Sequence, residues 1–311
     1  MMSYESYRFH FTYDNLLENH IMTTRRDVLR GAALLGGAAL LGTRNAFAEE
    51  ATACSVCPNL AYSRMLGWSI GPQIYSFNRF PFDEAIKLVK QTGSISFELY
   101  RGQKLTKDGE DKVGPGMSKE AFKRVRELCT EAGCVPHAMG VTGFDRAHFD
   151  FAASLGIQVL NVEPGFDKIP EINKLAAEYR ISVGLHNHPK PSIYWDPDIV
   201  LKQLADSDSW IGACCDTGHW VRSGLDPLEC VKKFKGRIVS FHIKDLNDQK
   251  RDIPLGKGVC KIEEILKECA DQKVRATFSI EYEADWDKNM PLVAEGVKFF
   301  NETAKKIVLG S

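Results

Sequence analysis

The strongest constraint on the fold is a regular alternation between residues 67 and 305. Short runs of β-branched and other apolar residues alternate with longer segments whose apolar residues recur at helical spacing. Parallel strands joined by helices make right-handed crossovers, so the alternation predicts a parallel sheet. Strands are expected at 68–77, 95–100, 134–141, 157–164, 181–188, 211–218, 237–245 and 277–283.

The segments between these runs have the features of surface helices. Ser118 is a candidate N-cap, and Gly133 follows the same segment as a candidate C-terminal stop. Helices are expected at 81–93, 118–133, 168–180, 197–207, 226–236, 261–273 and 293–308. An open doubly wound sheet fits this order, but eight βα units of this length favour a closed (β/α)8 barrel, a TIM barrel.

Domain boundaries follow from the same pattern. No serine-rich linker or block of charge divides residues 67–305, so we expect one barrel domain there, followed by a tail at 306–311. Residues 49–66 are expected to form a flexible segment before the barrel. Because Met22 offers a later start, residues 1–21 could be an over-extended gene start.

Residues 1–48 have the pattern of an export signal rather than of a buried helix. Arg25 and Arg26 precede an apolar run at 31–42, and residues 46–48 read Ala-Phe-Ala, a signal-peptidase pattern. The apolar run is too short for a permanent membrane span. The order resembles a twin-arginine signal, which implies the twin-arginine translocase as a partner and a periplasmic or otherwise exported protein.

Charge and cysteine content exclude other classes. The 311 residues carry 40 Lys and Arg against 41 Asp and Glu, so no basic field indicates a nucleic-acid partner. Nine scattered cysteines do not indicate a disulfide framework. Cys54 and Cys57 form a CxxC that fits a labile disulfide or an unstructured tail. Cys214 and Cys215 cannot both be metal ligands, because neighbours on a strand point to opposite faces.

Ionisable residues collect at one end of the later strands. From the fourth strand onward, each strand begins apolar and finishes in charged or imidazole side chains. In a TIM barrel these C-terminal ends form the rim that carries the active site. Unpaired charges there are costly, and a bound metal ion would offset the cost. The residues are Glu163, His186, His188, Asp216, His219, His242, Lys244, Asp245, Glu281 and Glu283.

Six short motifs stand in order on these strands and loops: GPQIYSFN (71–78), GLHNHP (184–189), DTGHW (216–220), FHIKD (241–245), LGKGVCKIEEIL (255–266) and SIEYE (279–283). Together they resemble the xylose isomerase-like TIM barrels known as the sugar phosphate isomerase/epimerase family. The resemblance covers residues 67–305. It implies a barrel enzyme that acts on a carbohydrate with the help of one divalent metal ion.

The resemblance also implies a metal site. The family's ligands correspond to Glu163, Asp216, His242 and Glu281, and His186 could replace Glu163. Three carboxylates and one imidazole suit Mn²⁺, Mg²⁺, Co²⁺ or Zn²⁺.

The implied reaction is proton abstraction next to a sugar carbonyl, through an enediolate, as in an isomerase or epimerase. Glu163 and Glu281 would remove and return the proton. Substrate would be held by His186, His188, His219 and Lys244, with Glu98 and Trp195 lining the same pocket. Taken singly, each of these residues also fits a structural role.

Departures from the family pattern keep other functions open. Ketose 3-epimerases have an arginine six residues after the strand-seven histidine, where this chain has Asp248, with Arg251 nearby. No phosphate cradle is evident. A 3-keto-glycoside lyase or hydrolase with the same metal site is therefore the alternative enzyme, and a non-catalytic sugar-binding barrel is the alternative outside enzymes. The sequence leaves a homo-oligomer open.

Overall fold

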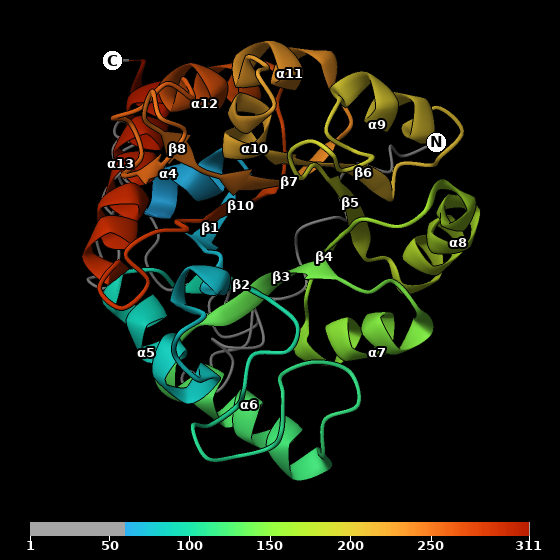
Figure 1. The fold of residues 1–311 in the computed structure, drawn as a ribbon, viewed down its shortest axis with the longest axis vertical. Coiled ribbons are helices and arrows are strands. Elements are labelled where there is room, and N and C mark those ends of the chain that lie inside the picture. Colours follow the sequence, from blue (N-terminus) through green and yellow to red (C-terminus); the bar gives the residue numbers. More distant parts are fainter. Residues whose placement is uncertain (1–59, 311) are drawn as a thin grey trace, which may run out of the picture. The chain divides into compact units, whose positions relative to one another are not determined.

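Eight parallel strands form one sheet that curves into a barrel, with helices arranged around the outside (Figure 1). The computed structural model describes residues 60–310. The strand order is β1-β10-β7-β6-β5-β4-β3-β2, so each strand lies beside its neighbour in the βα series. The strands are β1 (Ser69–Pro72), β2 (Ser96–Leu99), β3 (Val135–Thr142), β4 (Val159–Val162), β5 (Ser182–His186), β6 (Ile211–Asp216), β7 (Ile238–Ile243) and β10 (Thr277–Ile280). The single-domain TIM barrel is confirmed.

The barrel closes between β1 and β2, which are joined by few backbone hydrogen bonds. One isolated parallel bridge joins Gln73 to Glu98, and Ser96 Oγ donates to the Ile70 carbonyl oxygen at 2.9 Å. The strands approach so closely here that a Cβ on Gly71 would lie 1.7 Å from the Ser96 carbonyl oxygen. Only glycine fits at this position.

The helices follow the predicted segments closely. Ser118 Oγ caps α6 by accepting a hydrogen bond from Ala121 N at 3.1 Å, and Gly133 ends the helix with φ 68°. Both predicted helix ends are confirmed. The main helices are α5 (Phe82–Gln91), α6 (Lys119–Ala132), α7 (Arg146–Leu155), α8 (Ile169–Tyr179), α9 (Pro197–Leu204), α11 (Pro227–Lys233), α12 (Ile262–Asp271) and α13 (Met290–Leu309).

Several elements were not predicted. The run 68–77 forms only β1 before turning into the 3-10 helix η2 (Ile74–Phe77), because Gln73 caps that helix by accepting from Tyr75 N. Helix α7 and the β8–β9 hairpin (Asp245–Leu246, Asp252–Ile253) were missed, and DTGHW continues into helix α10 (Thr217–Arg222).

The predicted ends of the domain need correction. Leu60–Met65 forms helix α4, fixed by a 2.8 Å hydrogen bond from Ser63 Oγ to Asn301 Oδ1 of α13. The described part of segment 49–66 is therefore largely helical, and α13 continues through most of the predicted tail. The predicted signal peptide, Cys54 and Cys57 lie outside the described residues. Within residues 60–310, no helix combines the length and apolarity of a membrane span.

A buried histidine in the barrel interior makes folding stability depend on pH. His137 is 4% exposed and hydrogen-bonded to the hydroxyls of Ser69, Ser96 and Ser279. Burial lowers its pKa to about 4, and the charge on His242 acts in the same direction, against the attraction of Glu98. Below pH 6.5, the ordinary pKa of histidine, His137 is protonated in the unfolded chain, whereas in the folded chain it stays neutral until the pH approaches 4. Stability from this residue is therefore present at pH 7 and lost as pH falls from 6.5 towards 4.

We expect His137→Gln to lose less stability than the wild type on acidification. The difference between the two chains should approach about 3 kcal/mol between pH 7 and pH 4. Urea unfolding at several pH values measures it. Parallel pH profiles for the two proteins would show that His137 is not the titrating group.

Candidate metal centre

Three of the four predicted metal ligands converge at the C-terminal end of the barrel. One ligand atom from each of Asp216, His242 and Glu281 lies within 4.8 Å of the others. Strand register places them there, because Asp216 is paired with His242 across β6 and β7, and Glu281 follows the last residue of β10. All three side chains are buried, with at most 7% of the residue exposed.

Lys244 supplies a positive charge between these carboxylates. Its Nζ lies 2.9 Å from Asp216 Oδ2, 3.0 Å from Glu281 Oε2 and 3.4 Å from Glu283 Oε2. Burial opposes the charged form of the lysine, but the three carboxylates outweigh it and raise the Lys244 pKa. Burial likewise opposes ionisation of Asp216, yet the charge of nearby Lys244 helps to hold its pKa well below the usual range. These carboxylates are thus arranged around a cation.

Glu98 and Glu281 each contact one ring nitrogen of His242. The Nε2 atom of His242 lies 3.0 Å from Glu98 Oε1, and its Nδ1 lies 3.0 Å from Glu281 Oε2. Burial opposes protonation of the imidazole, but Glu98 and Glu281 raise the His242 pKa well above normal. Glu98 is completely buried and also accepts hydrogen bonds from Asn161 Nδ2 and Ser279 Oγ. Glu98 therefore has the buried, hydrogen-bonded environment of a structural residue, which is the alternative to the pocket-lining role.

This carboxylate–histidine pair predicts a loss of metal affinity when Glu98 is changed. A carboxylate behind a ligating histidine fixes which ring nitrogen faces the metal, and its removal typically costs 10- to 100-fold in affinity. We expect Glu98→Gln to weaken Mn²⁺ binding by about that factor in a chelator-competition titration. Ser279→Ala, which removes one hydrogen bond to Glu98, should have a smaller effect. Unchanged affinity in Glu98→Gln would contradict this role.

Glu163 belongs to a neighbouring cluster with the two histidines of the GLHNHP motif. Glu163 Oε1 lies 3.0 Å from His186 Nδ1, accepts from His188 N at 3.0 Å, and also contacts His188 Nδ1. Burial opposes its ionisation, but the hydrogen bonds from both histidines hold its pKa well below normal.

His186 connects this cluster to the three converging ligands. Its Nε2 lies 3.6 Å from Asp216 Oδ2, and this buried nitrogen has no hydrogen-bond partner in the described part of the chain. The structure therefore groups Glu163 with His186 and His188 rather than directly with Asp216, His242 and Glu281. His186 occupies the position between them.

A guanidinium that sequence reasoning missed also reaches the site. Arg222, at the end of α10, lies 3.1 Å from His219 Nδ1 and 3.0 Å from Glu283 Oε2, and it pairs with Asp252 of the β8–β9 hairpin. Burial lowers the pKa of His219 to about 2 against the attraction of Asp216, and the charge of Lys244 acts in the same direction as burial. His219 is therefore neutral at physiological pH. Asp248 stands where ketose 3-epimerases have an arginine, and Arg251 lies nearby in the sequence. Unlike Arg222, both residues are exposed.

Asn187 fixes the backbone of Asp216, and Gly218 makes room for Lys244 beside it. Asn187 accepts from Asp216 N at 2.8 Å and donates to its carbonyl oxygen at 3.0 Å. A Cβ on Gly218 would lie 2.8 Å from Lys244 Cβ, so this glycine makes room for the lysine. Asn187 lies inside the GLHNHP motif, and its place in that motif was the only sequence signal available.

The structure also shows the surroundings of two further residues singled out in the sequence, Trp195 and Asp245. Trp195 is half-buried, and the ammonium group of Lys190 covers its ring at 3.8 Å from the centroid. Neighbouring Tyr194 is fully buried and donates to the Pro164 carbonyl oxygen, so it offers no open face. Asp245 accepts backbone hydrogen bonds from Gly256, Gly258 and Cys260, which indicates that it orders this loop.

The donor set fits a divalent metal ion. Two buried carboxylates and one imidazole provide hard and borderline ligand atoms from three strands. Glu281 Oε2 lies 3.0 Å from both His242 Nδ1 and Lys244 Nζ, yet within residues 60–310 it makes no well-directed hydrogen bond. His186 Nε2 is a second buried polar atom that faces the cluster without a hydrogen bond among these residues. Both atoms therefore have the environment expected of ligand atoms that can accept a metal ion. Metal binding would require His242 to lose its proton.

The fold and this site define a TIM barrel with a buried cluster of acidic and imidazole groups at the C-terminal end of its strands. The family model for xylose isomerase-like TIM barrels matches residues 86–303, and the chain belongs to that family.

Individual relatives are more distant. An inosose dehydratase of Bacillus thuringiensis (strain Al Hakam) is 28% identical over 138 residues, a match covering 38% of this chain and 46% of that protein. The match thus spans less than half the length of this curated relative.

Two solved structures share the fold. A D-tagatose 3-epimerase-like protein is 18% identical with a TM-score of 0.63, over 78% of this chain and 99% of that one. A xylose isomerase-like TIM barrel protein from Mycobacterium smegmatis, in complex with magnesium, is 14% identical with a TM-score of 0.61, over 75% and 92%. At these identities the likeness concerns the fold.

Proposed function

We propose that the protein is a metal-dependent isomerase or epimerase that removes a proton from carbon next to a carbonyl of a sugar or sugar derivative. The observation that carries this proposal is the convergence of Asp216, His242 and Glu281 at the C-terminal end of the barrel. Several buried charges in one place are costly unless they are paired or bind an ion, and groups with perturbed pKa values cluster at functional sites.

The bound cation would be held by Asp216, His242 and Glu281, with Glu163 or His186 as a fourth ligand. When bound, a divalent ion such as Mn²⁺, Mg²⁺, Co²⁺ or Zn²⁺ polarises the substrate carbonyl as a Lewis acid. The magnesium complex of the M. smegmatis barrel is consistent with a hard divalent ion in this fold.

Two carboxylates are suited to move the proton. Glu163 follows β4 and Glu281 follows β10, so they reach the site from well-separated strands. Both have lowered pKa values and are ionised at neutral pH, as a general base must be. Glu163 keeps 21% of its side chain exposed, which leaves it accessible to substrate.

Imidazole and ammonium groups nearby can bind the substrate's oxygens. His188 is 45% exposed at the mouth of the site, and neutral His219 can donate to or accept from a hydroxyl. Charged Lys244 is a donor for a developing oxyanion.

Elimination is the second candidate, because the same proton abstraction can be followed by loss of a group on the next carbon. The local similarity to inosose dehydratase supports a lyase. So does Asp248, which stands where ketose 3-epimerases have an arginine. A 3-keto glycoside would then lose its aglycone.

Solvent exchange tests the proposal. Metal-loaded protein is incubated in D₂O with free aldoses and ketoses and with 3-keto glucosides, and the products are followed by NMR. We expect solvent deuterium at one carbon next to the carbonyl, and its loss in Glu163→Gln and Glu281→Gln. Release of the aglycone identifies the lyase. A non-catalytic sugar-binding barrel would incorporate no deuterium from any of these compounds.

We also propose that residues 1–48 direct export through the twin-arginine translocase, on the sequence pattern alone. Replacing Arg25 and Arg26 by lysine should retain the unprocessed chain in the cytoplasm, as measured by cell fractionation. Normal export of this double variant would contradict the assignment.

A further inference from the structure

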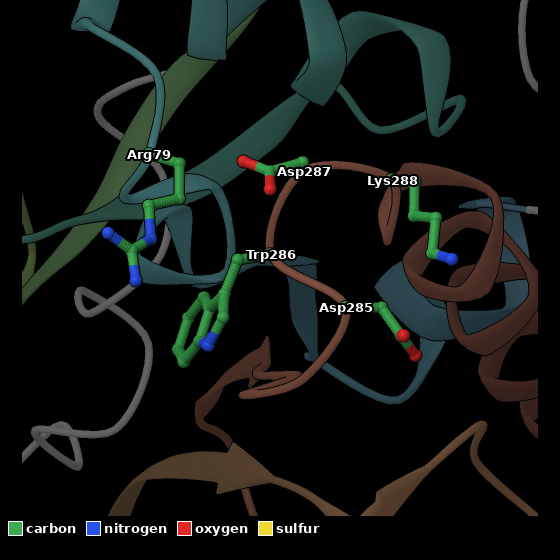
Figure 2. A pocket seen from close by; sticks show the side chains of 5 residues that line it. All are labelled: Arg79, Asp285, Trp286, Asp287 and Lys288. Carbon is green, nitrogen blue, oxygen red and sulfur yellow. The ribbon is translucent and has the colours of Figure 1, made fainter.

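A hollow of about 440 Å³ lies between two loops on the same rim as the metal centre. Pro72 of β1 is paired with Ile280 of β10, so the segments that follow these strands leave the barrel side by side. Arg79 comes from the first segment and Trp286 from the second. Figure 2 shows these two side chains extending in the same direction from their separate segments. The lining is completed by Asp285, Asp287 and Lys288.

Aromatic rings extend one side of this hollow. Tyr75 packs edge-on against Trp286, with centroids 5.8 Å apart, and edge-on against Tyr100, with centroids 5.1 Å apart. Tyr75 is 37% exposed, and the other two rings are partly exposed. The three residues follow β1, β2 and β10, so they gather at the closing seam of the barrel. Partly exposed, fixed aromatic rings provide apolar area with polar edges for a ligand.

The hollow is preformed. Asn289 is 1% exposed, and its Nδ2 donates to the carbonyl oxygens of Ser76, Tyr282 and Ala284. Tyr282 N donates to Ser76 Oγ at 3.0 Å. These bonds tie the loop that carries Trp286 to η2, so little ordering is required when a ligand binds.

The charges of the lining are balanced. Arg79 and Lys288 contribute two positive charges, and Asp285 and Asp287 contribute two negative charges. All four side chains belong to exposed residues. The lining therefore offers both donors and acceptors without a net field, which suits a neutral polyhydroxylated ligand better than a phosphate or an acidic sugar.

We propose that this hollow is a subsite for the second sugar ring of a glycoside, one face of which packs on Trp286 while its hydroxyls meet the charged groups. The inference rests on the proposed function, which places the reacting ring at the metal centre. Glu283 links the metal centre to the hollow. Its carboxylate lies 3.4 Å from Lys244 Nζ, and it stands two residues before Asp285 in the sequence.

Calorimetric titration of the metal-loaded protein tests the subsite. The probes are glucose, galactose, mannose and xylose, together with cellobiose, maltose, lactose, mannobiose and xylobiose. At least one disaccharide should bind about tenfold more tightly than its monosaccharide. Trp286→Ala should remove this preference and leave monosaccharide affinity and metal content unchanged. Trp286→Phe, which keeps a ring, should retain most of the preference.

Tyr62→Ala is the matched control, because Tyr62 lies on α4, before β1 and thus at the opposite end of the barrel. It should keep the disaccharide preference. Equal binding of mono- and disaccharides by the wild type, absence of binding by all probes, or an unchanged preference in Trp286→Ala overturns the subsite. If only the proposed function is wrong, the solvent-exchange experiment shows no deuterium incorporation while the disaccharide preference is still present.

Discussion

Purified wild-type protein is expected to contain one divalent metal ion per chain, and Asp216→Ala to contain almost none. Asp216 provides a buried carboxylate beside His242 and Glu281. We expect metal affinity to fall at least about 1000-fold, or about 4 kcal/mol, with activity lost in parallel. Elemental analysis and metal titration measure the effect.

Asp226→Ala provides the control for this experiment. Like Asp216, Asp226 caps a helix and pairs with a lysine, but it lies at the surface at the start of α11. Its removal should leave the metal content unchanged. Equal metal content in wild type and Asp216→Ala would refute the metal centre.

The second large effect is expected at Lys244. In metal-free protein, Lys244→Met leaves Asp216 and Glu281 without the ammonium that neutralises them. Removing one partner of a buried ion pair typically costs about 3–5 kcal/mol of unfolding free energy. Added Mn²⁺ should reduce this difference, because it neutralises the same carboxylates. Urea unfolding with a chelator and with Mn²⁺ measures both states.

Lys257→Met is the matched control, since Lys257 pairs with Glu295 at the surface. It should have little effect on stability in either condition. If Lys244→Met were equally destabilised with and without metal, the lysine and the metal would not share their carboxylate partners.

Much of the site could be predicted because strand ends converge. Once the alternation indicates a parallel barrel, residues at the C-terminal ends of its strands must meet at one rim. Asp216, His242 and Glu281 meet in this way. The inward direction of Asp216 follows from the two-residue period of a strand, which also turns Cys214 inward. Cys214 accordingly lies in a cluster with His186 and His242.

The rest of the site depends on contacts that no local pattern encodes. Glu163 lies one residue beyond β4, where its direction is set by hydrogen bonds from His186 and His188. Arg222 reaches the centre from a helix that sequence reasoning did not recognise. The sequence left both a pocket-lining and a structural role open for Glu98, and its contact with His242 is formed only in the folded barrel. These positions follow from tertiary packing.

The sparse seam between β1 and β2 has a consequence for the mobility of the candidate metal centre. Strands joined by few backbone hydrogen bonds are where a native protein opens most readily by local fluctuation. Here the Gln73–Glu98 bridge at that seam includes the residue that orients His242. Transient separation of the two strands would release the imidazole from its fixed orientation without requiring the barrel to unfold.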